Sequence, residues 1–165
     1  FPRRDRYETL ASFKFRKNKY GAHVDGILPV GKTKRRFARE YHAFIFGVPL
    51  VNFNEFAAPL VVWERSHRIV ESFLFQKLST VPSTSWKDLD ITQIYQEARK
   101  EVFLRCKTKA IVVPVGGSYI LHRFTVHGIM PWGENGESEF DSRMVAYFRP
   151  SLARPEAWLS ENFNY

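Results

Sequence analysis

The apolar residues of this chain lie in short runs, and this pattern restricts its fold more than any other feature. The longest runs, residues 44–51 and 57–63, are far shorter than the roughly 20 residues that a membrane-spanning helix requires. The chain also contains 15 Phe and 7 Tyr, which favour strands. Its 165 residues suffice for one domain with a sizeable core. We expect a single domain over residues 1–165 and, because the sequence opens on Phe1, one truncated at its N-terminus.

Alternation of apolar and polar residues predicts most of the regular structure as strands. From Ala43 onward the segment 39–50 is apolar at successive positions, as expected for a strand at the centre of a sheet. Gly116-Gly117, between two apolar segments, is typical of a hairpin turn. The expected strands cover residues 9–19, 21–28, 39–50, 60–63, 110–115, 118–126 and 144–148.

Two segments have helical spacing instead. Residues 69–78 repeat apolar side chains at intervals of three and four, and Asp90 or Thr92 can cap a second helix that continues to about Arg105. Many short strands with one or two inserted helices predict a mainly β fold, a sandwich or jelly roll.

The net charge of +8 is confined to one end of the chain. Residues 1–40 contain 12 Lys or Arg and 4 acidic residues, whereas residues 41–165 contain 13 of each sign. A basic end can attract nucleic acid, an acidic lipid surface or an anionic substrate, and a solvated basic face is the simplest interpretation. A single cysteine, Cys106, leaves no internal disulfide and is typical of a cytoplasmic protein.

His23-Val24-Asp25 is the first segment that could bind a metal ion. On an extended chain, residues two apart point to the same face, so both side chains can reach one ion. With a second imidazole they would form a two-histidine, one-carboxylate site, which leaves positions open for substrates and dioxygen and is typical of non-haem Fe(II) oxygenases. The H-x-D pattern alone is weak evidence, because it arises easily by chance in a chain with five histidines.

The third ligand could come from any of the four other histidines. His42 lies in an apolar segment and His67 in a polar turn, so we expect structural roles for both. His122 and His127 are five residues apart and would face opposite sides of one regular strand. We expect His127 to be the ligand, because it ends its strand beside Gly128, where a side chain can turn toward the mouth of a cavity.

Arg143 heads the expected strand 144–148 that follows His127 along the chain. A guanidinium binds a carboxylate through two parallel hydrogen bonds and stays charged at any relevant pH. A dicarboxylate that chelates a metal ion at one end needs such a partner at the other. Once the metal site is granted, Arg143 is therefore a candidate anchor for the far carboxylate.

Four stretches together resemble the phytanoyl-CoA dioxygenase family of Fe(II)- and 2-oxoglutarate-dependent oxygenases. They occur in the family's order and cover the chain from about residue 20 to 150. These stretches are residues 21–26 (GAHVDG), 58–67 (APLVVWERSH), 116–128 (GGSYILHRFTVHG) and 143–148 (RMVAYF).

The resemblance implies a double-stranded β-helix, a cupin-like jelly roll, with a defined site. His23, Asp25 and His127 would bind Fe(II). Arg143 would anchor the cosubstrate 2-oxoglutarate, with Phe46 beside it. The implied reaction is a hydroxylation or desaturation of a small molecule by dioxygen, with release of succinate and CO2. Related halogenases replace the carboxylate to make room for halide, so the presence of Asp25 favours hydroxylation or desaturation.

Two other functions stay open on the sequence. A cupin-like metal-binding barrel without oxygenase turnover would keep the three ligands and would not need Arg143. A basic module that docks nucleic acid or a membrane through residues 1–40 would need no metal, and its binding would weaken steeply with salt. The partners we expect are dioxygen and a small-molecule substrate, for which the basic end leaves an anionic compound open. We expect neither a membrane span nor a nucleic-acid partner.

Overall fold

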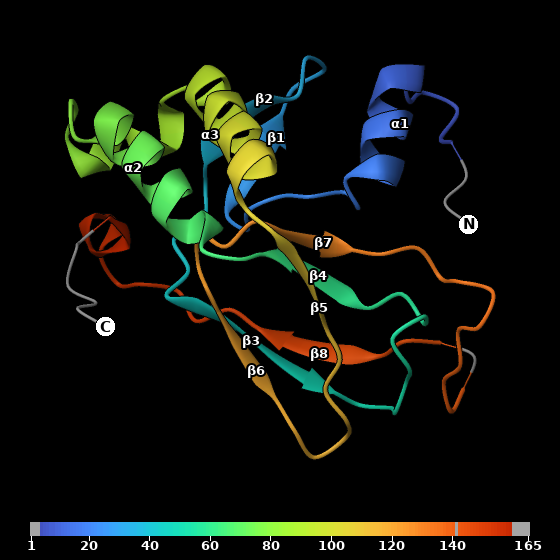
Figure 1. The fold of residues 1–165 in the computed structure, drawn as a ribbon. Coiled ribbons are helices and arrows are strands. Elements are labelled where there is room, and N and C mark those ends of the chain that lie inside the picture. Colours follow the sequence, from blue (N-terminus) through green and yellow to red (C-terminus); the bar gives the residue numbers. More distant parts are fainter. Residues whose placement is uncertain (1–3, 141, 160–165) are drawn as a thin grey trace.

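The computed structural model describes residues 4–140 and 142–159, in which two runs of four short strands flank a central group of helices along the chain (Figure 1). In chain order the elements are α1 (Leu10–Asn18), β1 (Ile27–Val30), β2 (Arg35–Ala38), β3 (Phe44–Pro49), β4 (Leu60–Trp63), α2 (Ser66–Leu78), the 3-10 helix η1 (Ser83–Asp88), α3 (Thr92–Arg105), β5 (Thr108–Ile111), β6 (Tyr119–His122), β7 (His127–Ile129), β8 (Val145–Phe148) and the 3-10 helix η2 (Pro155–Trp158).

The strands form three small antiparallel sheets. β1 pairs with β2, β3 lies between β6 and β8, and β4 lies between β5 and β7. None of these sheets closes or curls, and helices make up a share of the chain similar to that of the strands. The prediction of a mainly β, double-stranded β-helix or cupin-like jelly roll is therefore wrong, and the fold is mixed α/β. The same finding removes the alternative of a cupin-like barrel.

Short strands explain why the sheets stay small. β3 has six residues and β7 only three. Proline lacks the N–H that a continuing ladder needs, and Pro49 ends β3 while Pro59 directly precedes β4. Each three-stranded sheet is therefore a short ladder around one apolar central strand.

The predictions for the central strands and for two helices are confirmed. Residues 60–63 form β4, and the predicted strand 39–50 contains β3. The predicted helices lie within α2 and α3, and at the start of α3 the backbone N–H of Thr92 donates to Asp90 Oδ1 at 2.9 Å. None of the described helices is both long and apolar enough to cross a membrane.

The segment 9–19, predicted as a strand, contains the helix α1 instead. Thr9 Oγ1 accepts a hydrogen bond from the backbone N–H of Ser12 at 3.1 Å and caps this helix. No residue of α1 is buried. The alternation of aromatic and basic residues in this segment does not separate a buried face from a solvent-exposed face. It is therefore not evidence for a strand.

The predicted hairpin at Gly116-Gly117 is also wrong. The turn exists, because Gly116 has a φ of +89° and the N–H of Gly117 donates to the carbonyl of Pro114. However, the flanking strands do not pair with each other: β5 pairs with β4, and β6 pairs with β3. The turn thus carries the chain from one sheet to the other.

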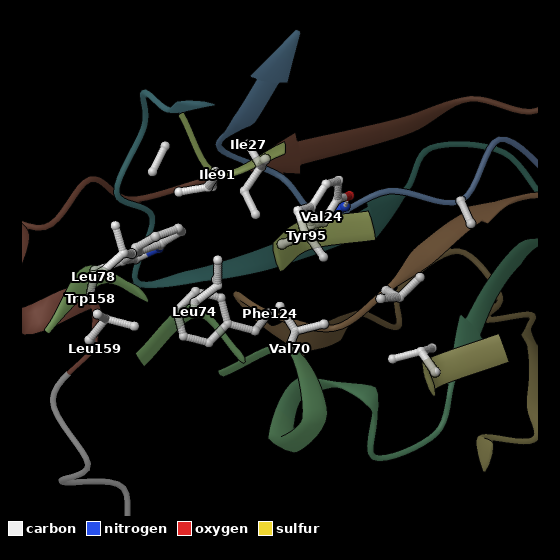
Figure 2. Packing of buried hydrophobic residues seen from close by; sticks show 14 of the residues in the cluster. Val24, Ile27, Val70, Leu74, Leu78, Ile91, Tyr95, Phe124, Trp158 and Leu159 are labelled. Atoms are coloured by element: carbon white, nitrogen blue, oxygen red, sulfur yellow. Dashed lines mark hydrogen bonds between the residues drawn. The ribbon is translucent and has the colours of Figure 1, made fainter. Parts of the chain in front are cut away.

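The larger core lies between the helices and one face of the β4 sheet. Figure 2 shows Val70, Leu74 and Leu78 of α2 gathered with Tyr95 of α3 and with Phe124. The sheet contributes Val61 and Trp63 of β4 to the same cluster. Burying each such side chain contributes roughly 1.5–3 kcal/mol relative to leaving it exposed. This core fixes β4 and, through it, the neighbouring β7.

A smaller apolar cluster lies between the two three-stranded sheets. Ile45 of β3 and Leu121 of β6 contribute to it from one sheet, and Leu60 and Val62 of β4 contribute from the other. All four residues of β4 are buried, since alternate residues serve the two clusters. This cluster fills part of the space between the sheets, and buried polar groups beside it require specific partners.

Candidate metal centre

The segment that carries His23 and Asp25 is extended and ends in a tight turn. Asp25 is followed by Gly26, which has a φ of +82°. A Cβ added to Gly26 would lie 2.1 Å from the carbonyl oxygen of Glu40, so only glycine fits this turn. The turn directs the chain into β1. As expected for residues two apart on an extended chain, His23 and Asp25 reach each other, with 3.2 Å between Nε2 and Oδ1.

His127 comes to the same point as the first residue of β7. It pairs with Val62 of β4 and exchanges two backbone hydrogen bonds with His23, of 2.9 and 3.0 Å. The next residue is Gly128, where an added Cβ would lie 2.3 Å from the carbonyl oxygen of Tyr20. A larger residue at position 128 would therefore push apart the two segments that carry the histidines.

His23, Asp25 and His127 form a cluster whose ligand atoms all lie within 4.8 Å of one another. Asp25 Oδ1 is 3.2 Å from His23 Nε2 and 3.6 Å from His127 Nε2. Two ligand atoms about 2.1 Å from a metal ion and at right angles to each other are about 3 Å apart. The carboxylate therefore lies near the separation that one shared ion requires from each imidazole.

The backbone fixes which nitrogen of each imidazole faces Asp25. His23 Nδ1 donates to the carbonyl of Gly21 at 3.0 Å, and His127 Nδ1 donates to the carbonyl of Thr125 at 2.9 Å. In a neutral ring the remaining nitrogen, Nε2, then presents a lone pair. Two lone pairs directed at a carboxylate oxygen repel it unless a cation lies between them. The arrangement thus needs either protons on both rings or one metal ion.

Asp25 stays ionised in this setting. Burial alone would raise the pKa of Asp25, but the hydrogen bonds from His127, His23 and Arg149 and the charge of His127 outweigh burial and hold that pKa well below its usual range. Its side chain is 10% exposed, that of His127 is 8% exposed and that of His23 is 47% exposed. The cluster is therefore anchored in the protein on one side and open to solvent at His23.

Sequence reasoning missed Arg149, which follows β8 and contacts Asp25. Its Nε donates to Asp25 Oδ2, and its guanidinium lies 5.3 Å from the centre of the Tyr147 ring. The spacing of the residues around β8 could have predicted Arg149. Residues 143, 147 and 149 are separated by even numbers and share one face of a regular strand, so an arginine assigned to the site at 143 points to a second one at 149.

Arg143, the predicted anchor for a carboxylate, lies at the other end of this row. Its Nη2 donates to the hydroxyl of Tyr147 at 2.9 Å, whereas its Nε is buried and has no hydrogen-bond partner among the described residues. It does not contact the cluster of His23, Asp25 and His127 directly, and Tyr147 lies between it and Arg149. An orphaned buried donor of this kind is unfavourable and fits a ligand that supplies an acceptor.

Tyr147 of this row contacts a second tyrosine, Tyr119, on a neighbouring strand of the sheet. Tyr119 of β6 and Tyr147 of β8 both pair with Gly47 of β3, and their hydroxyls are 3.0 Å apart across it. Burial, together with Tyr147, raises the pKa of Tyr119 above its usual value. The Tyr119 hydroxyl therefore stays protonated at neutral pH and can donate a hydrogen bond.

Phe46, the predicted aromatic beside the cosubstrate, is not brought to the cluster. It stacks on Phe148, with 6.1 Å between the ring centres. The neighbouring Ile45 packs between the two sheets, and successive side chains of a strand alternate between faces. Phe46 therefore lies on the outer face of its sheet.

The other histidines lie outside the cluster of His23, Asp25 and His127. His42 is buried and contacts the carboxylate of Glu40, while the rings of His67 and His122 lie 4.8 Å apart near the start of α2. His122 and His127 are not on one strand, as the sequence had suggested. β6 ends at His122, and a turn closed by the hydrogen bond from Thr125 N–H to the carbonyl of His122 separates it from β7.

The basic end of the chain is partly neutralised by nearby acids. Arg16 pairs with Glu8 at 2.7 Å, and Arg35 pairs with Asp90 at 2.5 Å.

Comparisons of the chain with protein-family models, curated proteins and solved structures gave no match. The case for a function therefore rests on the cluster itself.

Proposed function

We propose that the protein is an Fe(II)- and 2-oxoglutarate-dependent dioxygenase that hydroxylates a small molecule and releases succinate and CO2. One observation carries the proposal: two imidazoles, each with Nδ1 committed to a backbone carbonyl, direct Nε2 at the same oxygen of Asp25. Unless both rings are protonated, this donor set needs a cation. Two histidines and one carboxylate on one side of an ion are the ligand set of non-haem Fe(II) oxygenases.

The donor set fits Fe(II) in kind and number. His23, Asp25 and His127 would hold the ion, and the carbonyls of Gly21 and Thr125 would keep both rings in the orientation that binding requires. When bound, Fe(II) supplies the activation of dioxygen, which no protein side chain can provide.

Arg143 and the two tyrosines support a dicarboxylate as cosubstrate. Arg143 has a buried donor without a partner, and the hydroxyl that it contacts on Tyr147 is itself bonded to Tyr119. These groups would bind the carboxylate that is farther from the metal and would keep water away from it. The chain itself would thus bind and orient both the metal and the cosubstrate.

Anaerobic titration tests the proposal. Fe(II) and 2-oxoglutarate should each raise the affinity of the protein for the other. On admission of air, the mixture should form succinate, measured by mass spectrometry, and the Asp25→Ala variant should form none. Binding of Fe(II) that 2-oxoglutarate does not affect, with no succinate, would instead indicate a metal-binding domain without oxygenase turnover.

A further inference from the structure

We propose that Arg149 couples the metal ion to an anionic ligand. The guanidinium would lower the affinity of the site for a divalent ion alone, and it would hold the carboxylate of a second ligand beside that ion. This inference rests on the proposed metal site and adds a role for a residue outside the three metal ligands.

The two oxygens of the Asp25 carboxylate have different partners. Oδ1 faces both imidazoles, whereas Oδ2 accepts a hydrogen bond from Arg149 Nε. Arg149 is thus a cation held directly against a candidate metal ligand. Its side chain is 37% exposed, so the guanidinium is packed on one side and reachable from solvent on the other.

With a divalent ion bound, the site would carry excess positive charge. A divalent ion, one carboxylate and two neutral imidazoles leave one positive charge, and Arg149 raises this to two. The ion and the guanidinium would share one carboxylate, so they repel each other at short range. At about 4 Å, even with the dielectric constant of water, repulsion between a dication and a unit charge corresponds to roughly a 30-fold change in an equilibrium constant.

An anionic ligand beside the metal would offset this excess charge. A carboxylate bound beside the metal would lie next to the guanidinium, which forms its strongest hydrogen bonds with planar oxyanions. The ligand class is therefore an oxo acid or another carboxylate that contacts the metal. Because linkage is reciprocal, such an anion must raise metal affinity by the same factor by which the metal raises anion affinity.

Arg149→Gln is the informative variant. Its amide N–H can still donate to Asp25, so the variant removes the charge and retains the type of hydrogen bond. Arg149→Lys retains the charge and loses the planar fork. Arg35→Gln is the matched control, since Arg35 Nε also donates to a carboxylate, that of Asp90, which lies outside the proposed site.

The experiment measures free Mn(II) by its electron paramagnetic resonance signal, with and without 2-oxoglutarate. We expect Arg149→Gln to bind Mn(II) alone about 10-fold more tightly than the wild type does. The factor by which 2-oxoglutarate raises the affinity for Mn(II) should be at least about 10-fold smaller in this variant than in the wild type. Arg149→Lys should stay within about threefold of the wild type, and Arg35→Gln should leave the affinity for Mn(II) alone unchanged.

Unchanged or weaker binding of Mn(II) alone by Arg149→Gln would overturn the coupling. In that case Arg149 would only orient Asp25. A wild-type protein that binds no Mn(II) at all, alone or with 2-oxoglutarate, would contradict the proposed function instead. The titration of the wild type and the ratio between variant and wild type thus separate the two failures.

Discussion

His23 and His127 exchange two backbone hydrogen bonds, of 2.9 and 3.0 Å, although 104 positions separate them in the sequence. This bridge brings their rings to 4.5 Å between centres. The cluster of His23, Asp25 and His127 is therefore assembled by main-chain pairing, and the side chains complete it. Because β7 is held by β4, and β4 is buried on both faces, the position of His127 depends on both apolar clusters.

Gly47 should be needed for the contact between Tyr119 and Tyr147. A Cβ at position 47 would lie 2.3 Å from Cζ of Tyr119, so Gly47→Ala should push the ring away and break the hydroxyl pair. We expect the free energy of unfolding in urea to fall by about 1–3 kcal/mol. Gly133→Ala is the control, since its Cβ would meet nothing closer than 3.5 Å. Equal stability of the two variants would mean that Tyr119 is not held against Gly47.

Arg143 should matter for the cosubstrate and not for the metal. Replacing it with Gln removes a charged donor whose Nε is buried without a partner. Loss of a charge-assisted interaction of about 1.5–3 kcal/mol corresponds to roughly 10- to 150-fold weaker binding of 2-oxoglutarate. Calorimetric titration of the Mn(II)-loaded protein measures this. A similar loss of Mn(II) affinity in the absence of 2-oxoglutarate would count against the assignment.

His122 should make the protein less stable in mild acid. Burial, the nearby His67 and Arg123 lower the pKa of His122 from 6.5 to about 4. The backbone N–H of Phe124 donates to its Nδ1 at 3.2 Å, a bond that protonation of Nδ1 would break. The folded state thus takes up this proton less readily than the unfolded state. Stability is complete above pH 6.5 and falls as the pH decreases toward 4.

The His122→Gln variant tests this effect. Between pH 7 and pH 4.5 the wild type should lose about 2 kcal/mol more unfolding free energy than the variant does. Urea denaturation at the two pH values gives both numbers. Parallel losses in the two proteins would show that other groups cause the acid sensitivity.

The sequence predicts some parts of this molecule because they depend on local rules. The central strands β3 and β4 are apolar at successive positions, and the helices α2 and α3 repeat their apolar residues with helical spacing. His23 and Asp25 lie together because residues two apart on an extended chain share a face. These features require no knowledge of distant contacts.

Other parts depend on which strands pair, and no local pattern decides that. The segments on either side of Gly116-Gly117 resemble a hairpin, yet each finds a more deeply buried partner in a different sheet. His127 was selected on the premise of one continuous strand, whereas a turn separates it from His122. The spacing from Arg143 could place Arg149 on the same strand face, but its contact with Asp25 depends on the register of β8 against β3.

The central claim is that His23, Asp25 and His127 together bind one divalent ion. Metal analysis after anaerobic equilibrium dialysis against Fe(II) tests it most directly. The wild type and His122→Ala should each retain one ion per chain, and Asp25→Ala and His127→Ala should retain none. Their loss of affinity should exceed the roughly 10- to 100-fold that removal of a residue supporting a ligand costs. Retention of the ion by His127→Ala together with its loss from His122→Ala would contradict the account.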